Sequence, residues 1–180
     1  LPRYLATVRG GAANDRVRRT APGGRWHHHP VSDLDLLATA RVAHFATADQ
    51  YAVPHVVPIV FAWLPPHLYT PIDAKPKRDP DWRSLRRVRN IEMNGKASVV
   101  VDRWDEDWTR LGWVLVEGLA AFVEDEAERA RAVAALEAKY PQYRALPLDG
   151  CPIVRVTVDH TVRWGASPRG TRTPRTWRSV

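Results

Sequence analysis

The sequence predicts a mainly β domain in which six or so antiparallel strands form a barrel, accompanied by about three helices. Two observations favour this class. Segments rich in β-branched and aromatic residues are separated by short turns. Helical segments are too few to alternate with the strands, as a parallel sheet would require. The length of 180 residues suits one folded domain.

The first half of the domain is predicted to contain one helix and three strands. The helix begins at Ser32, because SDLDLLATA offers a Ser N-cap followed by apolar residues at helical spacing. The strands follow in RVAHFATAD (41–49), AVPHVVPIVFAWL (52–64) and HLYTPI (67–72). Polar residues at 49–50 and the pair Pro65–Pro66 supply the turns, so we expect an antiparallel meander.

The second half is predicted to contain two helices and three strands. DWRSLRRVRNIEM (81–93) has apolar residues at three-residue spacing and ends before Gly95. KASVVVDRW (96–104) and GWVLVEGLAAFV (112–123) have the composition of strands. Asp125 and Glu128 form a capping-box pattern for a helix over 126–140, and CPIVRVTVDHTVRW (151–164) is the last strand.

The formal net charge of +7 comes from the two ends of the chain. Residues 1–30 hold six Arg and one Asp, and residues 161–180 hold five Arg and no acid, whereas residues 31–160 carry a net charge of −3. Both ends lack apolar periodicity, so we predict flexible basic arms over 1–31 and 167–180 around a domain at 32–166. Binding of nucleic acid by these arms remains an alternative, although no array of base-stacking aromatics is evident.

Other classes find little support in the sequence. No run of 18 apolar residues or signal-peptide pattern is visible, and the lone Cys151 cannot form an internal disulfide, so we expect a cytoplasmic protein without a membrane span. The HHH run at 27–29 cannot direct all its rings to one ion, so no metal site is predicted. There is no Rossmann glycine motif, Walker lysine motif or nucleophile elbow.

A basic cluster is the strongest chemical signal. Between Lys75 and Lys96 there are eight basic residues and three acids. Lysines in a turn between a strand and a helix can converge on an anion near the helix N-terminus. A solvated helix face remains the alternative for Arg83, Arg86, Arg87 and Arg89. Lys75, directly after the strand, is the best candidate for binding an anion.

The order of LYTPIDAKPKR, LRRVRNIEMNGKASVVVDRWDEDW and KYPQYRALPLDG resembles the pyridoxamine-phosphate-oxidase-like split-barrel flavoproteins over residues 33–166. More narrowly, it resembles the branch of probable oxidoreductases that depend on the deazaflavin coenzyme F-420. The resemblance implies an FMN-binding-type split β-barrel and a phosphate-binding role for Lys75. Asp73 stands where the family more usually has Ser. The cofactor-binding residues that it implies are His55, Val56, Val57, Pro58, Ile59, Tyr69, Thr70, Lys75, Lys77, Arg78, Trp104 and Trp164.

The resemblance also implies a homodimer with the cofactor at the subunit interface, where the second subunit contributes Asp102 to Trp104 and Trp164. The expected function is hydride transfer between F-420 and a small conjugated substrate. An FMN-dependent oxidase or reductase, and a flavin- or haem-binding protein without catalysis, remain alternatives. The polyglutamate tail of F-420 would give the surrounding arginines an extended anion to bind, which favours F-420 over FMN. No catalytic residue is predicted.

Overall fold

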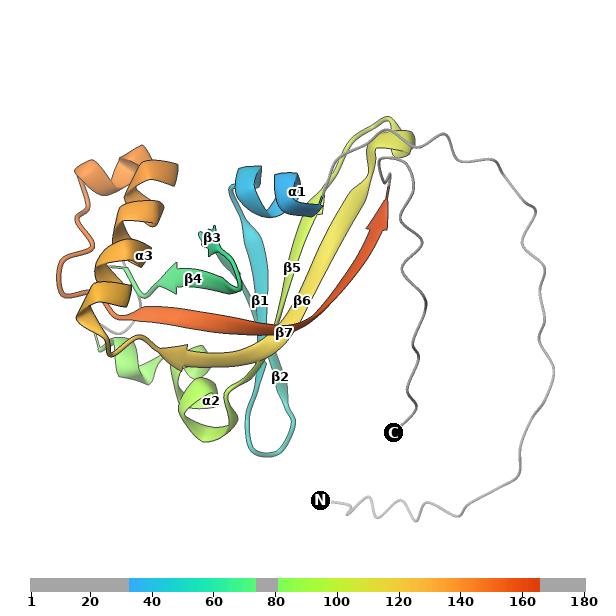
Figure 1. Cartoon of the computed structure of the whole chain (residues 1–180). Coiled ribbons are helices and arrows are strands. Elements are labelled where there is room, and N and C mark those ends of the chain that lie inside the picture. The colour runs from blue at the N-terminus through green and yellow to red at the C-terminus, as the bar shows by residue number, and fades with distance from the viewer. Residues whose placement is uncertain (1–32, 74–80, 166–180) are drawn as a thin grey trace, which may run out of the picture.

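The structure, a computed structural model, describes residues 33–73 and 81–165. The predicted arms at 1–31 and 167–180 lie outside this range, as do Lys75, Lys77 and Arg78. Figure 1 shows the arrangement of the elements. Their bounds are α1 Asp33–Thr39, β1 Ala43–Ala48, β2 Pro54–Ile59, β3 Ala62–Leu64, β4 His67–Pro71, η1 Trp82–Ser84, α2 Arg86–Asn94, β5 Lys96–Arg103, η2 Trp108–Arg110, β6 Gly112–Phe122, α3 Glu126–Lys139, η3 Pro141–Arg144 and β7 Ile153–Gly165.

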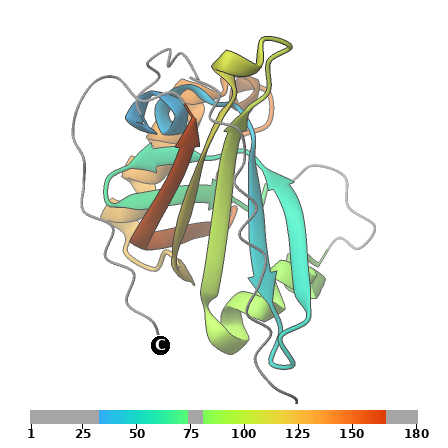
Figure 2. The ribbon, with the colours of Figure 1, turned by 90° about the vertical axis from the view of Figure 1, so that its right-hand side faces the viewer.

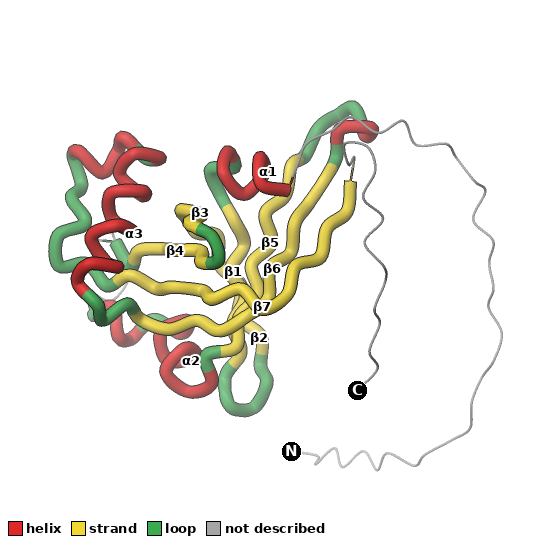
Figure 3. Tube along the Cα trace, viewed as in Figure 1, coloured by secondary structure: helices red, strands yellow, loops and turns green. Residues whose placement is uncertain are grey.

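The strands form one seven-stranded sheet in the order β2-β1-β5-β6-β7-β4-β3, and every pair is antiparallel. The long strands β6 and β7 run through both halves of the sheet, which curls into a half-barrel (Figures 1 and 2). In Figure 3 the strands form the body of the molecule and the helices lie at its margins. The prediction of a mainly β split barrel with three α-helices is confirmed.

The predicted single strand over 52–64 and the predicted three-stranded meander are wrong. The segment forms two strands, β2 and β3, which lie at opposite edges of the described sheet, so β4 pairs with β3 and β7 and not with β2. Between them Phe61 is fully buried, its N–H donates to the Tyr140 hydroxyl at 3.0 Å, and its carbonyl accepts from that hydroxyl at 2.9 Å. Because a side chain takes the place of a strand partner here, the chain can leave one edge of the sheet and join the other.

The helix boundaries follow local chemistry. The predicted helix over 81–93 is a 3-10 turn, η1, followed by α2, which ends at Gly95 in the left-handed conformation (φ 65°). Asp125 caps α3 by accepting from the Glu128 N–H, as the capping pattern predicts. The Glu128 side chain, however, binds Tyr69 and Arg155 instead of closing the box.

Two hydrophobic clusters hold the fold together. The larger one fills the inside of the curled sheet and includes Phe45, Leu68, Val99 and Val116. The second lies between α3, η3 and the sheet and includes residues of β3, β4 and β7; its core members are Ala62, Tyr69, Ala132, Leu136, Tyr140, Tyr143, Leu148 and Ile153. Helix α3 therefore covers one wing of the outer surface of the sheet. None of the helices in the described part of the chain is long and apolar enough to cross a membrane.

Candidate functional site

Strand β2, predicted to lie beside the cofactor, is an edge of the described sheet. It pairs with β1 on one side, with His44 opposite Pro58 and Ala48 opposite Pro54. Proline has no N–H for a ladder, so Pro54 and Pro58 occupy the positions that do not bond β1. Val56 lies between them in the same phase, and its N–H and C=O therefore face away from β1. The edge offers one N–H donor between two prolines, and the carbonyls of all three residues as acceptors.

The side chains of β2 alternate between the two faces of the sheet. Val57 and Ile59 contact the inner core, and His55 shares their phase, whereas Pro54, Val56 and Pro58 are exposed on the outer face. The ring of His55 lies near two arginines of α2. Burial, and then the charges of Arg86 and Arg87, lower the pKa of His55, so its ring is neutral at pH 7.

The N-terminus of α2 has the features of an anion site. Its N-cap residue, Leu85, makes no side-chain capping bond, and the first turn contains no acid. It contains Arg86 and Arg87, although a positive charge is unfavourable at this end of the helix dipole. The Arg86 guanidinium is 3.4 Å from the Asp49 carboxylate, and the Arg87 side chain is half-buried. An anion at this end of α2 would be favoured by both guanidinium groups and by the helix dipole.

Asp73 lies two residues beyond β4, which ends at Pro71. Its side chain is only 9% exposed, and it accepts a hydrogen bond from the Tyr143 hydroxyl at 3.0 Å. Burial lowers the pKa of Arg87, while the negative charge of Asp73 raises it. The hydrogen bond to Asp73 joins the segment that follows β4 to η3.

Tyr69 and Thr70, predicted to lie together beside the cofactor, point to different sides of β4. Thr70 is 3% exposed and belongs to the inner side, like Leu68. The Tyr69 hydroxyl donates to Glu128 Oε1 at 2.8 Å under α3, and Arg155 Nη1 is 2.8 Å from Glu128 Oε2. Burial, followed by the bond to Glu128, raises the pKa of Tyr69 to about 12. The Tyr69 side chain is committed to the α3 wing, so its predicted place beside a cofactor stays a prediction.

The two predicted tryptophans lie at the far end of the sheet from the α3 wing. Trp164 of β7 pairs with Trp113 of β6, which in turn pairs with Asp102 of β5. Trp164 is 56% exposed, and Trp104, just after β5, is 69% exposed. The structure therefore brings Asp102, Trp104 and Trp164 to one end of the sheet. Along the sheet, β7 is four strand positions from β2, or about 19 Å.

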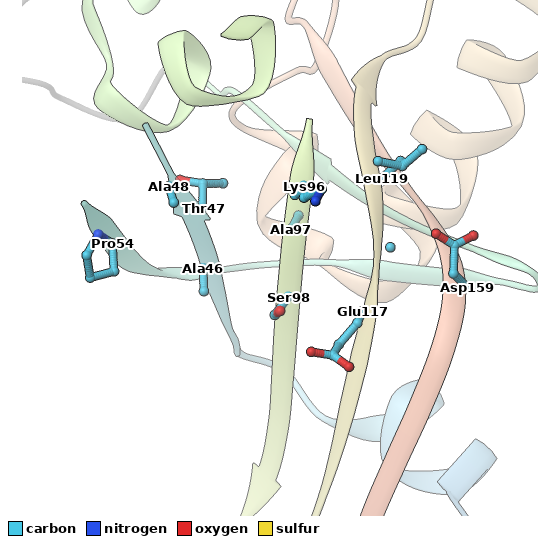
Figure 4. A pocket seen from close by; sticks show the side chains of 11 residues that line it. Ala46, Thr47, Ala48, Pro54, Lys96, Ala97, Ser98, Glu117, Leu119 and Asp159 are labelled. Atoms are coloured by element: carbon cyan, nitrogen blue, oxygen red, sulfur yellow. The ribbon is translucent and has the colours of Figure 1, made fainter. Parts of the chain in front are cut away.

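A hollow of about 490 Å³ lies on the outer face of the sheet, across strands β2, β1, β5, β6 and β7 (Figure 4). Its floor consists of the small residues Ala46, Ala48, Ser98 and Gly118. A Cβ at Gly118 would lie 1.9 Å from the Thr157 carbonyl oxygen, so the backbone there requires glycine. Pro54 and Leu119 form apolar walls, and the charged residues are Lys96, Glu117 and Asp159. A flat group or the side chains of another chain could pack on such a floor.

Sequence reasoning missed the partners of Asp73 and the hollow. Tyr143 lies 70 positions from Asp73 along the chain, and no local pattern indicates such a bond. The hollow combines residues of five strands that are far apart in the sequence, and the small residues of its floor carry no chemical signal. The described residues contain no cluster of His, Cys, Asp or Glu that could hold a metal ion.

Comparison with solved structures identifies similar folds. A protein of unknown function from Agrobacterium tumefaciens is 20% identical with a TM-score of 0.57; the match covers 73% of this chain but only 54% of that protein. A conserved hypothetical protein from Mycobacterium tuberculosis is 16% identical with a TM-score of 0.59, over 79% of this chain and 91% of that one. A FAD-binding protein from Mesorhizobium loti is 22% identical with a TM-score of 0.53, and the match covers 73% of this chain and 90% of that one.

The comparison of the sequence with curated proteins finds no significant match. The family model described as pyridoxamine 5'-phosphate oxidase matches residues 34–161, nearly the whole described domain. This agrees with the antiparallel half-barrel fold. The chain therefore belongs to the pyridoxamine 5'-phosphate oxidase family.

Proposed function

We propose that the protein is a homodimeric oxidoreductase that transfers hydride between the deazaflavin coenzyme F-420 and a small conjugated substrate. The observation that carries the proposal is the N-terminus of α2, where Arg86 and Arg87 occupy the first turn beside His55 of the edge strand. Such an arrangement suits the phosphate of a nucleotide-like cofactor. Membership of the family makes a flavin-type cofactor the natural occupant.

The donor set fits the phosphate of this cofactor. Arg87 offers a half-buried, permanently charged fork, and Arg86 adds a second one at the rim. Lys75, Lys77 and Arg78 stay predicted phosphate ligands, outside the described residues. His55 is neutral, so it can donate or accept a hydrogen bond without adding charge.

The edge of β2 suits a planar ring with polar edge atoms. Val56 provides a backbone N–H, and the carbonyls of Pro54, Val56 and Pro58 face the same way. When bound, the deazaflavin supplies the hydride chemistry. The chain's own part is to orient the ring along β2 and to exclude water.

The positively charged surface of η1 and α2 favours F-420 over FMN. Arg89 is exposed, and Arg83 lies over the Trp82 ring at 4.4 Å with its guanidinium accessible. Together with Arg86 they extend the positive surface beyond what one phosphate needs. The polyglutamate tail of F-420 would occupy that surface, whereas FMN has no such extension.

A second copy of the chain is part of the proposal. The outer face of the sheet exposes Val56 (57%), Leu119 (52%) and Trp164 (56%), and exposed apolar surface of this extent is typical of an interface. Trp164 lies about 19 Å from β2 along the sheet of its own chain, so a partner subunit is the means to bring it to the edge strand. The hollow on the same face would receive groups of the partner.

Fluorescence titration of the purified protein, separately with F-420 and with FMN, tests the proposal. Saturable F-420 binding with weaker FMN binding supports it, and Arg87→Ala should then weaken binding about tenfold or more, since a charge-assisted bond contributes roughly 1.5–3 kcal/mol. Arg131→Ala, an exposed arginine on α3, is the matched control and should bind normally. Preference for FMN would indicate a flavoprotein. Binding without turnover in any reductase assay would indicate a carrier of flavin or haem.

A further inference from the structure

Lys139, in the last turn of α3, has an amine held between two other segments of the chain. Its Nζ donates to the Leu37 carbonyl of α1 at 3.3 Å and lies 3.8 Å from the centre of the Phe61 ring. The ring covers one side of the amine without offering a lone pair, so water lost there is not replaced by another acceptor. Lys139 is half-buried and keeps part of its surface exposed. The amine is therefore poorly solvated although it belongs to a residue at the surface.

A second cation, Arg41, lies beside the same group. Its Nη1 donates to the backbone carbonyl of Lys139. Its guanidinium carbon is 4.6 Å from the centre of the Tyr140 ring, and Lys139 Nζ is 5.8 Å from that same centre. Within residues 33–73 and 81–165, no carboxylate forms an ion pair with either cation. Two positive charges thus share one aromatic ring, and their repulsion disfavours the protonated amine.

This environment makes the Lys139 amine available as a nucleophile. Burial, and then the charge of Arg41, lower its pKa from 10.5 to about 8. About a quarter of the amine is then unprotonated at pH 7.5, compared with about one in a thousand for a solvated lysine. Desolvation and a neighbouring cation are the two ways in which proteins activate lysine for covalent chemistry.

We propose that Lys139 is a site of acylation by small acyl phosphates, and that Arg41 binds the phosphate of the acyl donor. Arg41 suits this role because it is exposed and its planar guanidinium has further N–H donors besides the one that binds the Lys139 carbonyl. The inference is independent of the proposed function, since neither residue belongs to the proposed cofactor site.

The reaction needs no oxidant, reductant or metal ion. The Nζ lone pair attacks the carbonyl carbon of the acyl phosphate, and a C–N bond forms. The C–O bond to phosphate breaks, inorganic phosphate leaves with the electron pair of that bond, and Nζ loses one proton to solvent. The product is a neutral amide, so acylation removes one of the two cations at Tyr140 and with it their repulsion.

The test is a time course of the full-length protein with acetyl phosphate at pH 7.5. Peptide mass spectrometry gives the initial rates at Lys139 and at the exposed Lys96 of β5 in the same sample. We expect Lys139 to react about tenfold faster, because its larger unprotonated fraction outweighs the lower nucleophilicity of a weaker base. The rate at Lys139 should rise with pH to a plateau, with its midpoint at about pH 8. In concentrated urea the advantage over Lys96 should disappear, since it depends on the fold.

Two reagents separate the two roles of Arg41. Arg41→Gln should slow acetylation of Lys139 by acetyl phosphate about tenfold, because it removes both the phosphate donor and the neighbouring charge. With an uncharged reagent, the N-hydroxysuccinimide ester of acetate, the same variant should lose only about threefold, because only the effect of the neighbouring charge is lost. Arg131→Gln, at an exposed arginine of α3, is the matched control and should react as the wild type does. Circular dichroism establishes that each variant is folded.

Three results would overturn the inference. Lys139 could react no faster than Lys96, which would mean that the amine is shielded. The midpoint of its pH profile could lie near the ordinary value for lysine, which would mean that the Phe61 ring and the C-terminal dipole of α3 hold the proton. Arg41→Gln could leave the rate with acetyl phosphate unchanged, which would exclude Arg41 from the site. None of these results bears on cofactor binding, so the proposed function would stand.

Discussion

The outer surface of the sheet has two wings that differ in what covers them. One wing, formed by β3, β4 and the first part of β7, lies beneath α3 and η3, and its polar side chains Tyr69, Glu128 and Arg155 bind one another. The other, formed by β2, β1, β5, β6 and the second part of β7, exposes Val56, Leu119 and Trp164 and contains the hollow. The covered wing is packed against helices of the same chain, whereas the open wing has the edge strand, the apolar surface and the tryptophans that a ligand or partner could use.

The largest effect on stability is expected from truncating a buried leucine of the covered wing, and a leucine of the open wing provides the comparison. Leu136 of α3 is fully buried, and Leu136→Ala should lower the free energy of unfolding by about 2–5 kcal/mol. Leu119 is 52% exposed, and Leu119→Ala should cost less than about 1 kcal/mol at protein concentrations where the chain is a monomer. Urea denaturation measures both. Similar losses at every concentration would mean that the open wing is not open in solution.

Association through the open wing should depend on its exposed tryptophan. Trp164→Ala should weaken dimerisation about thirtyfold, corresponding to about 2 kcal/mol for a hot-spot aromatic. Tyr51→Ala in the β1–β2 turn removes an even more exposed aromatic, at 78%, from outside the apolar face and should have little effect. Sedimentation equilibrium gives the dissociation constants. An unchanged constant for Trp164→Ala would exclude this end of the sheet from the interface.

The hydrogen-bonded network of Tyr69, Glu128 and Arg155 in the covered wing should make the free energy of unfolding depend on pH. Hydrogen bonds from Tyr69 and Arg155 hold the pKa of Glu128 below its ordinary value, although burial opposes them. A carboxyl with a depressed pKa stabilises the fold above its unfolded pKa, and that stability is lost as the pH falls through the folded value. Glu128→Gln should therefore cost about 1–3 kcal/mol at pH 7 and progressively less toward pH 3. A constant difference across this range, measured by urea unfolding, would contradict the assignment.

The smallest effect concerns Lys139, at the end of α3. Burial, and then the charge of Arg41, lower its pKa from 10.5 to about 8, and its ammonium lies 3.8 Å from the centre of the Phe61 ring. The folded protein binds this proton more weakly than the unfolded chain, so folding should become more favourable as the pH rises above 8. Relative to Lys139→Met, the wild type should gain on the order of 1 kcal/mol between pH 7 and pH 9.5. Thermal unfolding at both pH values measures this, and no gain would contradict the lowered pKa.

Local patterns in the sequence predicted most elements of both wings. The strands around Phe45, Val99 and Val116 alternate buried and exposed residues, and Gly95 and Asp125 mark helix ends by backbone chemistry that involves only near neighbours. In α3, by contrast, alanines lie on every face and obscure the apolar stripe, and the buried residues of the helix are Ala132 and Leu136. The buried face of that helix is selected by the strands beneath it.

By itself, the sequence determined the mainly β class, the order of the helices and strands apart from the 52–64 segment, and the resemblance that leads to the family, because each depends on residues close together in the chain. Only the tertiary structure decided that residues 52–64 supply both edges of the described sheet, that Tyr69 turns to Glu128, and that Asp73 binds Tyr143. Those outcomes depend on contacts between residues 59 to 79 positions apart. The local secondary-structure propensity of a segment does not depend on such contacts. They form only when the whole chain packs together.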